Sequence, residues 1–260
     1  MKMYITFLFS LFSLLCPSYI AGMEKSPASS VTFNRTLSEL FELLGNPSQE
    51  KEIDSLTQTL LDLTGEKDFN PNASDHLTSP PLLLLLFHIE FEPCQKIASK
   101  LLSLQAINPN DYDAAGQTPL TCLIRFSKNA DPEVVEDLVD QLFNCVGFDI
   151  NLPNKHNQSP LLLSLRENNF TVGYKILNNP NLKILKRTYT TVLAHQKILK
   201  RDMKTITKDN ILYESTFKEK EFCDAIIAKY TAQKKKTKQK KEKPKKKKSL
   251  TKSKKPEKKS

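Results

Sequence analysis

Apolar residues in the middle of the chain recur with the helical period of about 3.6 residues, and the two-residue alternation of strands is scarce. One helix is well marked, with Asp131 as N-cap, Pro132 in the first position and Glu133 in the first turn. Its apolar face consists of Val134, Val135, Leu138, Val139 and Leu142. The apolar run at residues 82–87 is too short to span a bilayer and predicts a core-facing helix. The pattern predicts an all-α protein.

A short motif repeats along this helical region. Phe69-Asn70-Pro71-Asn72 recurs 38 residues later as Ile107-Asn108-Pro109-Asn110, and more loosely, after a further 43, as Ile150-Asn151-Leu152-Pro153-Asn154. Behind each copy a Pro-Leu step opens an apolar run, at Pro81, Pro119 and Pro160. The first two of these prolines are also 38 residues apart, so the two features share one register.

Each copy carries the signals of a helix pair. Proline suits the first turn of a helix, where its missing N–H would have no partner. Thr118 and Ser159 can cap the remaining free amides. The first helices are expected at about residues 119–127 and 159–167, and a polar break then leads to an antiparallel second helix. One such pair cannot bury its apolar faces alone, whereas stacked pairs share a core.

The middle copy resembles the ankyrin repeat, whose hallmark is Gly-x-Thr-Pro-Leu-His after an aspartate. Asp113-Ala114-Ala115-Gly116-Gln117-Thr118-Pro119-Leu120-Thr121 lacks only the histidine. Asn157-Gln158-Ser159-Pro160-Leu161-Leu162 keeps the frame, with Asn for Gly and Ser for Thr. Phe148-Asp149-Ile150-Asn151 is similar to the family's segment after the outer helix, and Pro80-Pro81-Leu82 is a weaker match. Spacings of 38 and 41 residues exceed the family's usual length, so the loops are expected to hold insertions.

The resemblance implies an ankyrin-like helical-repeat solenoid over residues 36–183, with units at about 36–72, 73–110, 111–152 and 153–183. A linker at residues 23–35 is expected to precede it. The first unit lacks the Thr-Pro-Leu step and is expected to be a capping repeat. Thr36-Leu37-Ser38-Glu39 is a capping box that would open its first helix, and Gly45 and Gly65 mark helix ends. Residues 184–232 are expected to form C-terminal capping helices, at about 186–200 and 211–230.

The first 22 residues have the pattern of an export signal. Lys2 precedes an apolar run at residues 4–15, Pro17 breaks any helix, and Ala21 and Gly22 offer a cleavage site. We expect a cleaved signal peptide at residues 1–22 and an exported protein, secreted or, in a bacterium, periplasmic. The alternative is a membrane anchor formed by residues 3–22, which are long enough to cross a bilayer.

The formal net charge of +10 is due to the end of the chain, where 16 lysines and two acids follow Gln233. We expect residues 233–260 to form a disordered tail. Its lysines would bind an anionic membrane, a glycan or a nucleic acid by counterion release, without sequence preference because arginine and aromatic residues are missing. The residues expected to do so are Lys245, Lys246, Lys247 and Lys248. The alternative is a tail that only keeps the protein soluble.

Motifs for catalysis are missing from the sequence, which holds no Gly-rich phosphate loop, no Gly-x-Ser-x-Gly turn and no zinc-spaced pair. The isolated histidines are His76, His88, His156 and His195. The cysteines expected to be buried as small apolar residues are Cys94, Cys122, Cys145 and Cys223. We therefore expect no enzymatic activity, cofactor, metal or small-molecule substrate.

The function implied by the resemblance is binding of another protein by a monomeric array. In ankyrin folds, partners usually contact the loop tips and the adjoining inner helices. The tips expected to bind hold Asp75, His76, Asn110, Asp111, Tyr112, Asn154, Lys155 and His156. Tyr112 is the leading candidate, because tyrosine offers a large rigid contact with a polar end, and the alternative is that it packs against the next loop. Polyanion binding by the tail, with the repeats as a carrier, is the other candidate function.

Overall fold

The computed structural model describes residues 27–74, 79–205 and 211–250, and every regular element in these ranges is a helix. The predicted all-α fold class is therefore confirmed. No helix in these ranges is long and apolar enough to cross a membrane. The segment predicted to be a signal peptide or an anchor, residues 1–22, lies outside the described residues.

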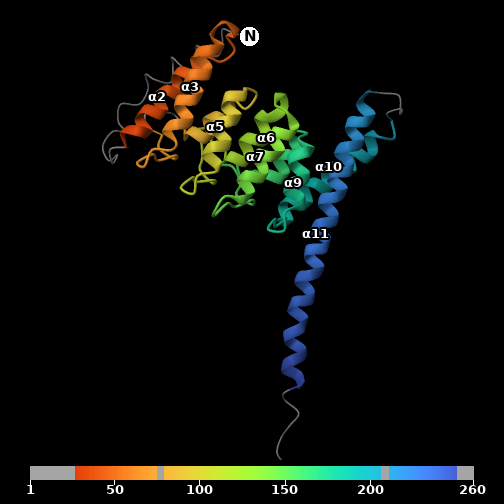
Figure 1. Cartoon of the computed structure of the whole chain (residues 1–260). Helices are drawn as coiled ribbons and strands as arrows, with labels where there is room; N and C mark the ends of the chain where they lie inside the picture. The colour runs from red at the N-terminus through yellow and green to blue at the C-terminus, as the bar shows by residue number, and fades with distance from the viewer. Residues whose placement is uncertain (1–26, 75–78, 206–210, 251–260) are drawn as a thin grey trace, which may run out of the picture.

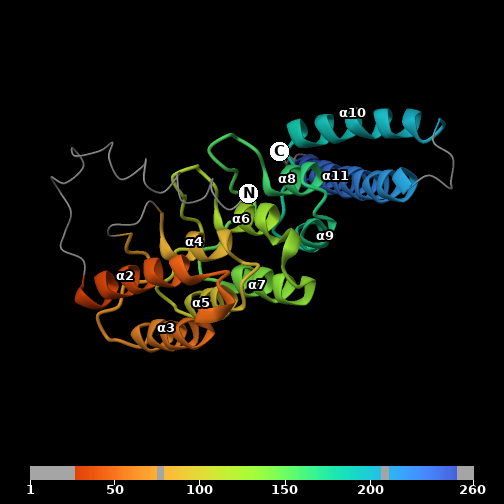
Figure 2. The same cartoon turned by 90° about the horizontal axis from the view of Figure 1, so that it is seen from above.

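Helix pairs follow one another along the described chain (Figure 1). Helices α4, α6 and α8 contact one another in order, and so do α3, α5, α7 and α9. The chain therefore forms two adjacent rows of helices (Figure 2). The pairs are α2 (Ala28–Leu43) with α3 (Glu50–Leu63), α4 (Pro81–Phe87) with α5 (Glu92–Leu102), α6 (Pro119–Phe126) with α7 (Pro132–Asn144), and α8 (Pro160–Arg166) with α9 (Phe170–Asn178). Short 3-10 turns, η1 (Pro47–Gln49) and η2 (Ser127–Asn129), lie within the first and third pairs.

The predicted caps are present at the helix starts. The Thr118 hydroxyl accepts a hydrogen bond from the Thr121 amide (3.3 Å), and the Thr121 hydroxyl accepts one from the Thr118 amide (2.7 Å). Ser159 caps α8, and Asp131 caps α7 by accepting from the Glu133 amide at 2.9 Å. Because a proline follows each of these caps, few amides of the first turn are left without a partner.

Apolar side chains from both rows form one continuous core. Four of the five leucines of α4 are buried, and Phe87 at its end is 48% exposed. This confirms that residues 82–87 form a core-facing helix. The four cysteines within the described residues are unpaired, and three of them are buried as expected, whereas Cys145 is half-buried.

The first helix differs from the prediction. Where the sequence predicts a linker at residues 23–35 and a capping box at Thr36, α2 already begins at Ala28 and Thr36 is buried within it. Phe33, Leu37 and Leu40 are fully buried and continue one apolar face through this region. Burial of this face therefore outweighs the local capping signal.

The end of the chain also differs from the prediction. Where a disordered tail is predicted from residue 233, α11 (Ile211–Leu250) continues as one helix to Leu250, and residues 251–260 lie outside the described part. Lysine and glutamine favour helices, and α11 contains no glycine. Pro244 lacks an amide hydrogen and neighbouring lysines repel one another, so local sequence preference alone does not account for the helical end of α11.

Helix α10 (Lys186–Asp202) and α11 pair along the end of the two rows. Phe222 of α11 is fully buried, with ring-centroid distances of 5.5 Å to Phe170 and 5.0 Å to Tyr174 of α9. Gly173 makes room for it, because a Cβ at this position would come within 2.5 Å of Phe222 Cζ. Nearby, the Lys229 ammonium donates to two carbonyls at the end of α9, where a cation also complements the helix dipole.

Replacing Phe222 by alanine is expected to lower the free energy of unfolding by about 3–5 kcal/mol, because a cavity would open between α9 and α11. The control is Phe217→Ala, on the same helix at a position 38% exposed. It should cost less than about 1 kcal/mol. Urea unfolding followed by circular dichroism measures both, and equal losses would contradict docking of α11 by Phe222.

Candidate functional site

The residues predicted to bind a partner lie on the loops between successive helix pairs. Two of these loops are in direct contact, since the Lys155 amide donates to the Gly116 carbonyl at 2.8 Å. Asp75 and His76 lie outside the described residues. The others are Asn110, Asp111 and Tyr112 between α5 and α6, and Asn154, Lys155 and His156 between α7 and α8.

An asparagine side chain bridges each loop to the next one. In every bridge Nδ2 donates to a carbonyl of the next loop, and Oδ1 accepts from the amide two residues further on. For Asn110 these partners are the Gly147 carbonyl (2.7 Å) and the Asp149 amide (2.9 Å). The other bridges are Asn72 to Ala106 and Asn108 (both 2.7 Å), and Asn151 to Asn181 and Lys183 (3.2 and 2.7 Å). We call Asn72, Asn110 and Asn151 the asparagine bridges.

Each bridge makes the pair of backbone hydrogen bonds that a neighbouring β-strand would make with an extended segment. In an extended chain, a carbonyl and the amide two residues later point to the same side, and one planar side-chain amide can serve both. The residue between the two bonded groups carries an apolar side chain in each bridge. At these positions Ile107 and Leu182 are buried, and Phe148 is half-buried. Each bridge thus fixes the loop backbone and directs an apolar side chain toward the core.

A tight polar turn holds each bridging asparagine in place. The Asn110 amide donates to Asn108 Oδ1 at 3.1 Å, which forms a local side-chain turn. The same bond, at 2.9–3.0 Å, recurs in Asn70–Asn72, Asp149–Asn151 and Asn179–Asn181.

These turns correct the predicted alignment of the third copy. Its equivalent segment is Asp149-Ile150-Asn151 and not residues 150–154. Asn151 follows Asn110 by 41 residues, the same interval that separates Pro119 from Pro160. The turn at Asn179 is a further copy that the sequence analysis missed, because no Pro-Leu step follows it.

Helix α11 ends the series of bridged loops. Gln233 Nε2 donates to the Leu182 carbonyl (2.7 Å), and Gln233 Oε1 accepts from the Ile184 amide (3.2 Å). The last loop is therefore bonded on both edges, by Asn151 on one and Gln233 on the other. Gln233 belongs to the folded part, although the sequence analysis places it in the tail.

Asn154 also has a structural role. It is 2% exposed, its amide donates to the Gln158 carbonyl (3.1 Å), and its Oδ1 accepts from the Gln158 amide (3.0 Å). Gly116 and Asn157 occupy the matching left-handed position of the two turns, with φ of 76° and 59°. Asparagine tolerates this conformation better than most residues, which explains its presence where the ankyrin-like motif has glycine. The matching pair in the other turn is Asp113 and Gln117.

Tyr112 packs against the next loop. Its hydroxyl donates to the Pro153 carbonyl at 3.0 Å, and Lys155 Nζ lies 5.6 Å from the centre of its ring. The ring remains half-buried. The structure therefore shows Tyr112 in the packing role, with its outer surface still accessible beside Lys155.

The predicted residues thus divide into two groups. Asn110 and Asn154 use their side chains to build the loops, and Asp111 accepts a bond from the Tyr112 amide (3.2 Å). Lys155 and His156 are exposed, and Lys155 lies against the Tyr112 ring. A cation, an imidazole and an aromatic ring on adjacent loops can bind a protein surface through hydrogen bonds, charge and stacking.

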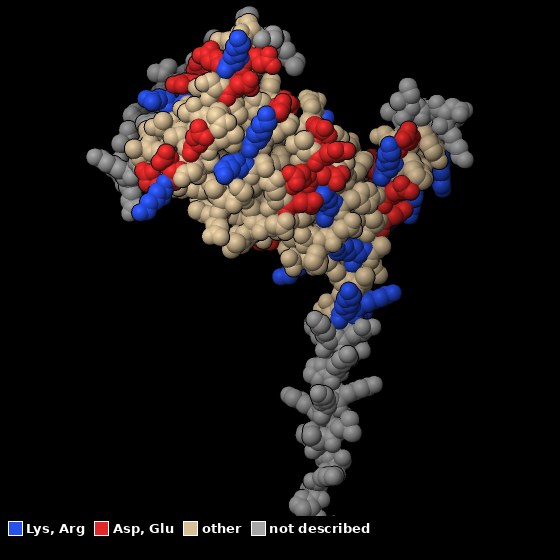
Figure 3. Space-filling model, viewed as in Figure 1, with Lys and Arg blue, Asp and Glu red and all other residues tan. Residues whose placement is uncertain are grey.

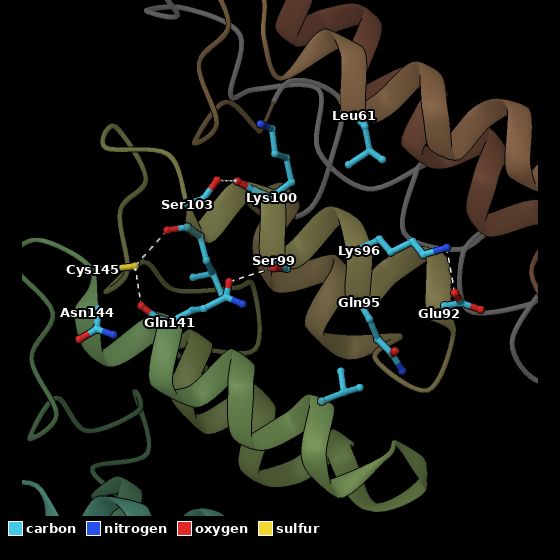
Figure 4. A pocket seen from close by; sticks show the side chains of 12 residues that line it. Leu61, Glu92, Gln95, Lys96, Ser99, Lys100, Ser103, Gln141, Asn144 and Cys145 are labelled. Carbon is cyan, nitrogen blue, oxygen red and sulfur yellow. Dashed lines mark hydrogen bonds and ion pairs between the residues drawn. The ribbon is translucent and has the colours of Figure 1, made fainter.

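A hollow of about 850 Å³ lies on the other row of helices, between α3, α5 and α7 (Figure 4). Ser99 donates to Gln141 Oε1 at 3.0 Å across it, and Glu92 pairs with Lys96 at 2.8 Å on its rim. Cys145 Sγ is bonded to the Leu102 carbonyl at 3.5 Å. No general base contacts Ser99, and burial raises the pKa of the Cys145 thiol, so neither side chain is set up as a nucleophile.

Aromatic rings gather at the ends of α2, α4 and α6. The Phe87 ring lies 4.4 Å from that of Phe126, and His88 lies 4.8 Å from Phe41. Burial lowers the pKa of His88, which is therefore neutral at physiological pH. His88 is thus a neutral residue at the end of α4. The recurrence of phenylalanine at the ends of α4 and α6 is the sequence signal that could have revealed the cluster.

Charges on the helix pairs are mostly negative. Residues 27–183 hold 20 acidic and 11 basic side chains. Figure 3 shows acidic side chains gathered along the helix rows, interrupted by single basic ones. Lys175 of α9 forms ion pairs with two acidic residues of α7, Asp140 (2.7 Å) and Glu136 (3.4 Å), which is typical of a solvated face. No cluster of His, Cys, Asp and Glu suited to a metal ion lies within the described ranges.

Comparison with known proteins adds no relative. No protein-family model, curated protein or solved structure matches the chain.

The bridges can be tested with a pair of asparagines at equivalent loop positions, Asn110 and Asn181. Asn110→Ala is expected to lower the free energy of unfolding by about 1–2 kcal/mol, because a carbonyl and an amide of the next loop lose their partner. The control is Asn181→Ala. Asn181 occupies the equivalent position in the last loop, and its side chain has no hydrogen-bond partner among the described residues. This substitution should cost less than about 0.5 kcal/mol. Chemical unfolding measures the free energy of unfolding of both variants. Equal losses would contradict a stabilising role for the bridge.

Proposed function

We propose that the protein binds another protein through the loop ends of an ankyrin-like array of stacked helix pairs. The observation that carries this proposal is the fixed register of neighbouring loops. The asparagine bridges and the bond from the Lys155 amide to the Gly116 carbonyl (2.8 Å) hold Tyr112 and Lys155 side by side on a rigid base. A preorganised surface loses less conformational entropy when a partner binds.

Several features support the ankyrin-like assignment. Proline occupies the first turn of α4, α6 and α8, and a left-handed residue precedes the last two of these helices in the same frame. Each helix pair shares its core with the next. In this proposal the array is a solenoid that α2 and α3 cap at one end and α10 and α11 at the other.

The proposal describes a monomeric scaffold without enzymatic activity. At the loop ends that the structure describes, the side chains offer contacts and no acid–base or nucleophilic arrangement. Export follows from the pattern of residues 1–22, which would place the binding surface outside the compartment of synthesis.

The lysine-rich end of α11 favours a second candidate function, binding of a polyanion. This part of α11 extends away from the helix rows (Figure 1). Its exposed lysines are Lys234, Lys235, Lys236 and Lys238. Like charges at helical spacing repel one another, so an anion that neutralises them would also stabilise the helix.

Reversing one exposed charge at the loop ends tests the main proposal. Lys155→Glu keeps the backbone bond to Gly116, and we expect at least about tenfold weaker binding of the partner that the full chain captures at raised salt. Biolayer interferometry with that partner measures the change. Lys51→Glu, at an exposed position of α3, is the control and should bind like the unmodified chain.

A partner held equally by both variants would contradict the assignment of the loop ends. Capture that disappears at raised salt, and also on replacing Lys245, Lys246, Lys247 and Lys248 by glutamine, would favour the tail instead.

A further inference from the structure

Helix α10 is the outermost element of the described chain. Figure 2 shows it at the edge of the molecule, with α11 between it and the helix rows. It packs against α11 through a buried side formed by Thr188, Val192, Gln196 and Leu199. The opposite side of α10 has no helix against it in the described structure.

The uncovered side of α10 carries basic residues at both ends, with Lys186 and Arg187 at its start and Lys197 and Arg201 in its last turns. Its residues recur at helical spacing and are all exposed. Residues 186–204 contain six basic side chains and one acidic one, Asp202. The face consists of Lys186, Arg187, Thr190, Thr191, Ala194, Lys197, Ile198 and Arg201. We call it the α10 face.

Two aliphatic side chains accompany these charges without being buried. Ile198, in the middle of the charged half of the face, is 47% exposed, and Leu185 at the helix start is 63% exposed. On the neighbouring part of α11, Phe217 is 38% exposed. Ile198 thus places an exposed apolar side chain next to cations, a combination that suits a surface that is both anionic and apolar.

We propose that the α10 face docks flat on the surface of an anionic phospholipid bilayer. Lys186, Arg187, Lys197 and Arg201 would contact the phosphate groups, and Ile198 would enter the boundary between headgroups and acyl chains. A nucleic acid would engage the same cations but would leave Ile198 and Leu185 in water, and the face presents no aromatic ring for base stacking.

Membrane docking by the α10 face is independent of the loop ends and of the tail. It requires neither a protein bound to the loop ends nor an anion bound to the tail. The loop ends belong to the segments between the helix pairs and not to α10.

The chain contains no tryptophan, so a single introduced one reports on its own surroundings. In the full chain, Ile198→Trp is expected to shift its emission to the blue on vesicles of phosphatidylcholine with phosphatidylglycerol, and not on vesicles of phosphatidylcholine alone. The control is Val146→Trp, in a loop of the helix rows at a position 83% exposed. Its emission should stay that of water-exposed tryptophan on both kinds of vesicle.

Charge variants separate the α10 face from the tail. Adding Lys197→Gln and Arg201→Gln to Ile198→Trp should raise the lipid concentration that gives half of the blue shift by roughly 30-fold. Replacing Lys245, Lys246, Lys247 and Lys248 by glutamine should weaken binding but leave the full blue shift at saturating lipid.

Three results would overturn the proposal. One is co-sedimentation with anionic vesicles while the Ile198→Trp emission is unchanged, which would assign binding to the tail. Another is a change on duplex DNA with none on vesicles. The third is an equal shift for Val146→Trp. None of these results bears on the loop ends, whose test uses a protein partner at raised salt.

Discussion

The stack depends on one recurring interaction, in which the side-chain amide of an asparagine serves a carbonyl and an amide of the next loop. Loops without strands must still satisfy their backbone polar groups. The asparagine bridges do so in the exposed loops, and they direct residues such as Ile107 and Leu182 into the core between the bonded groups. Loop register and helix stacking are therefore set by the same contact. The rigidity of the proposed binding surface follows from it.

The helix pair α10 and α11 closes this stack, and α11 uses the same interaction, a side-chain amide that bonds a loop carbonyl and a loop amide. Gln233 bonds the free edge of the last loop, and Phe222 fills the space over Gly173. This helix pair also differs in charge from the rest of the described chain. Charged residues in 27–183 are mostly acidic, whereas those of α10 and the end of α11 are mostly basic. The molecule thus presents loop ends suited to a protein and a basic edge suited to an anionic surface.

Much of the helical framework could be predicted from the sequence because its signals are local. Thr118, Ser159 and Asp131 cap the helices that they mark, and the paired prolines give the correct interval. The start of α2 could not be predicted, since burial of Phe33 against distant segments decides it. Among the candidate site residues, the sequence located the loops but not the roles. Asn110 and Asn154 resemble exposed loop residues until their partners in the folded chain are known.

The most direct test of the bridged stack is native-state hydrogen exchange of three loop amides, those of Asn108, Asp149 and Lys183. All three residues are exposed, and their amides donate only to an asparagine side chain of the preceding loop, at 2.7–2.9 Å. If the bridges hold the loops in register, these amides exchange far more slowly than exposed amides without a partner. Exchange at the rate of an unstructured peptide would contradict the bridges, and with them the rigid surface on which the proposed function depends.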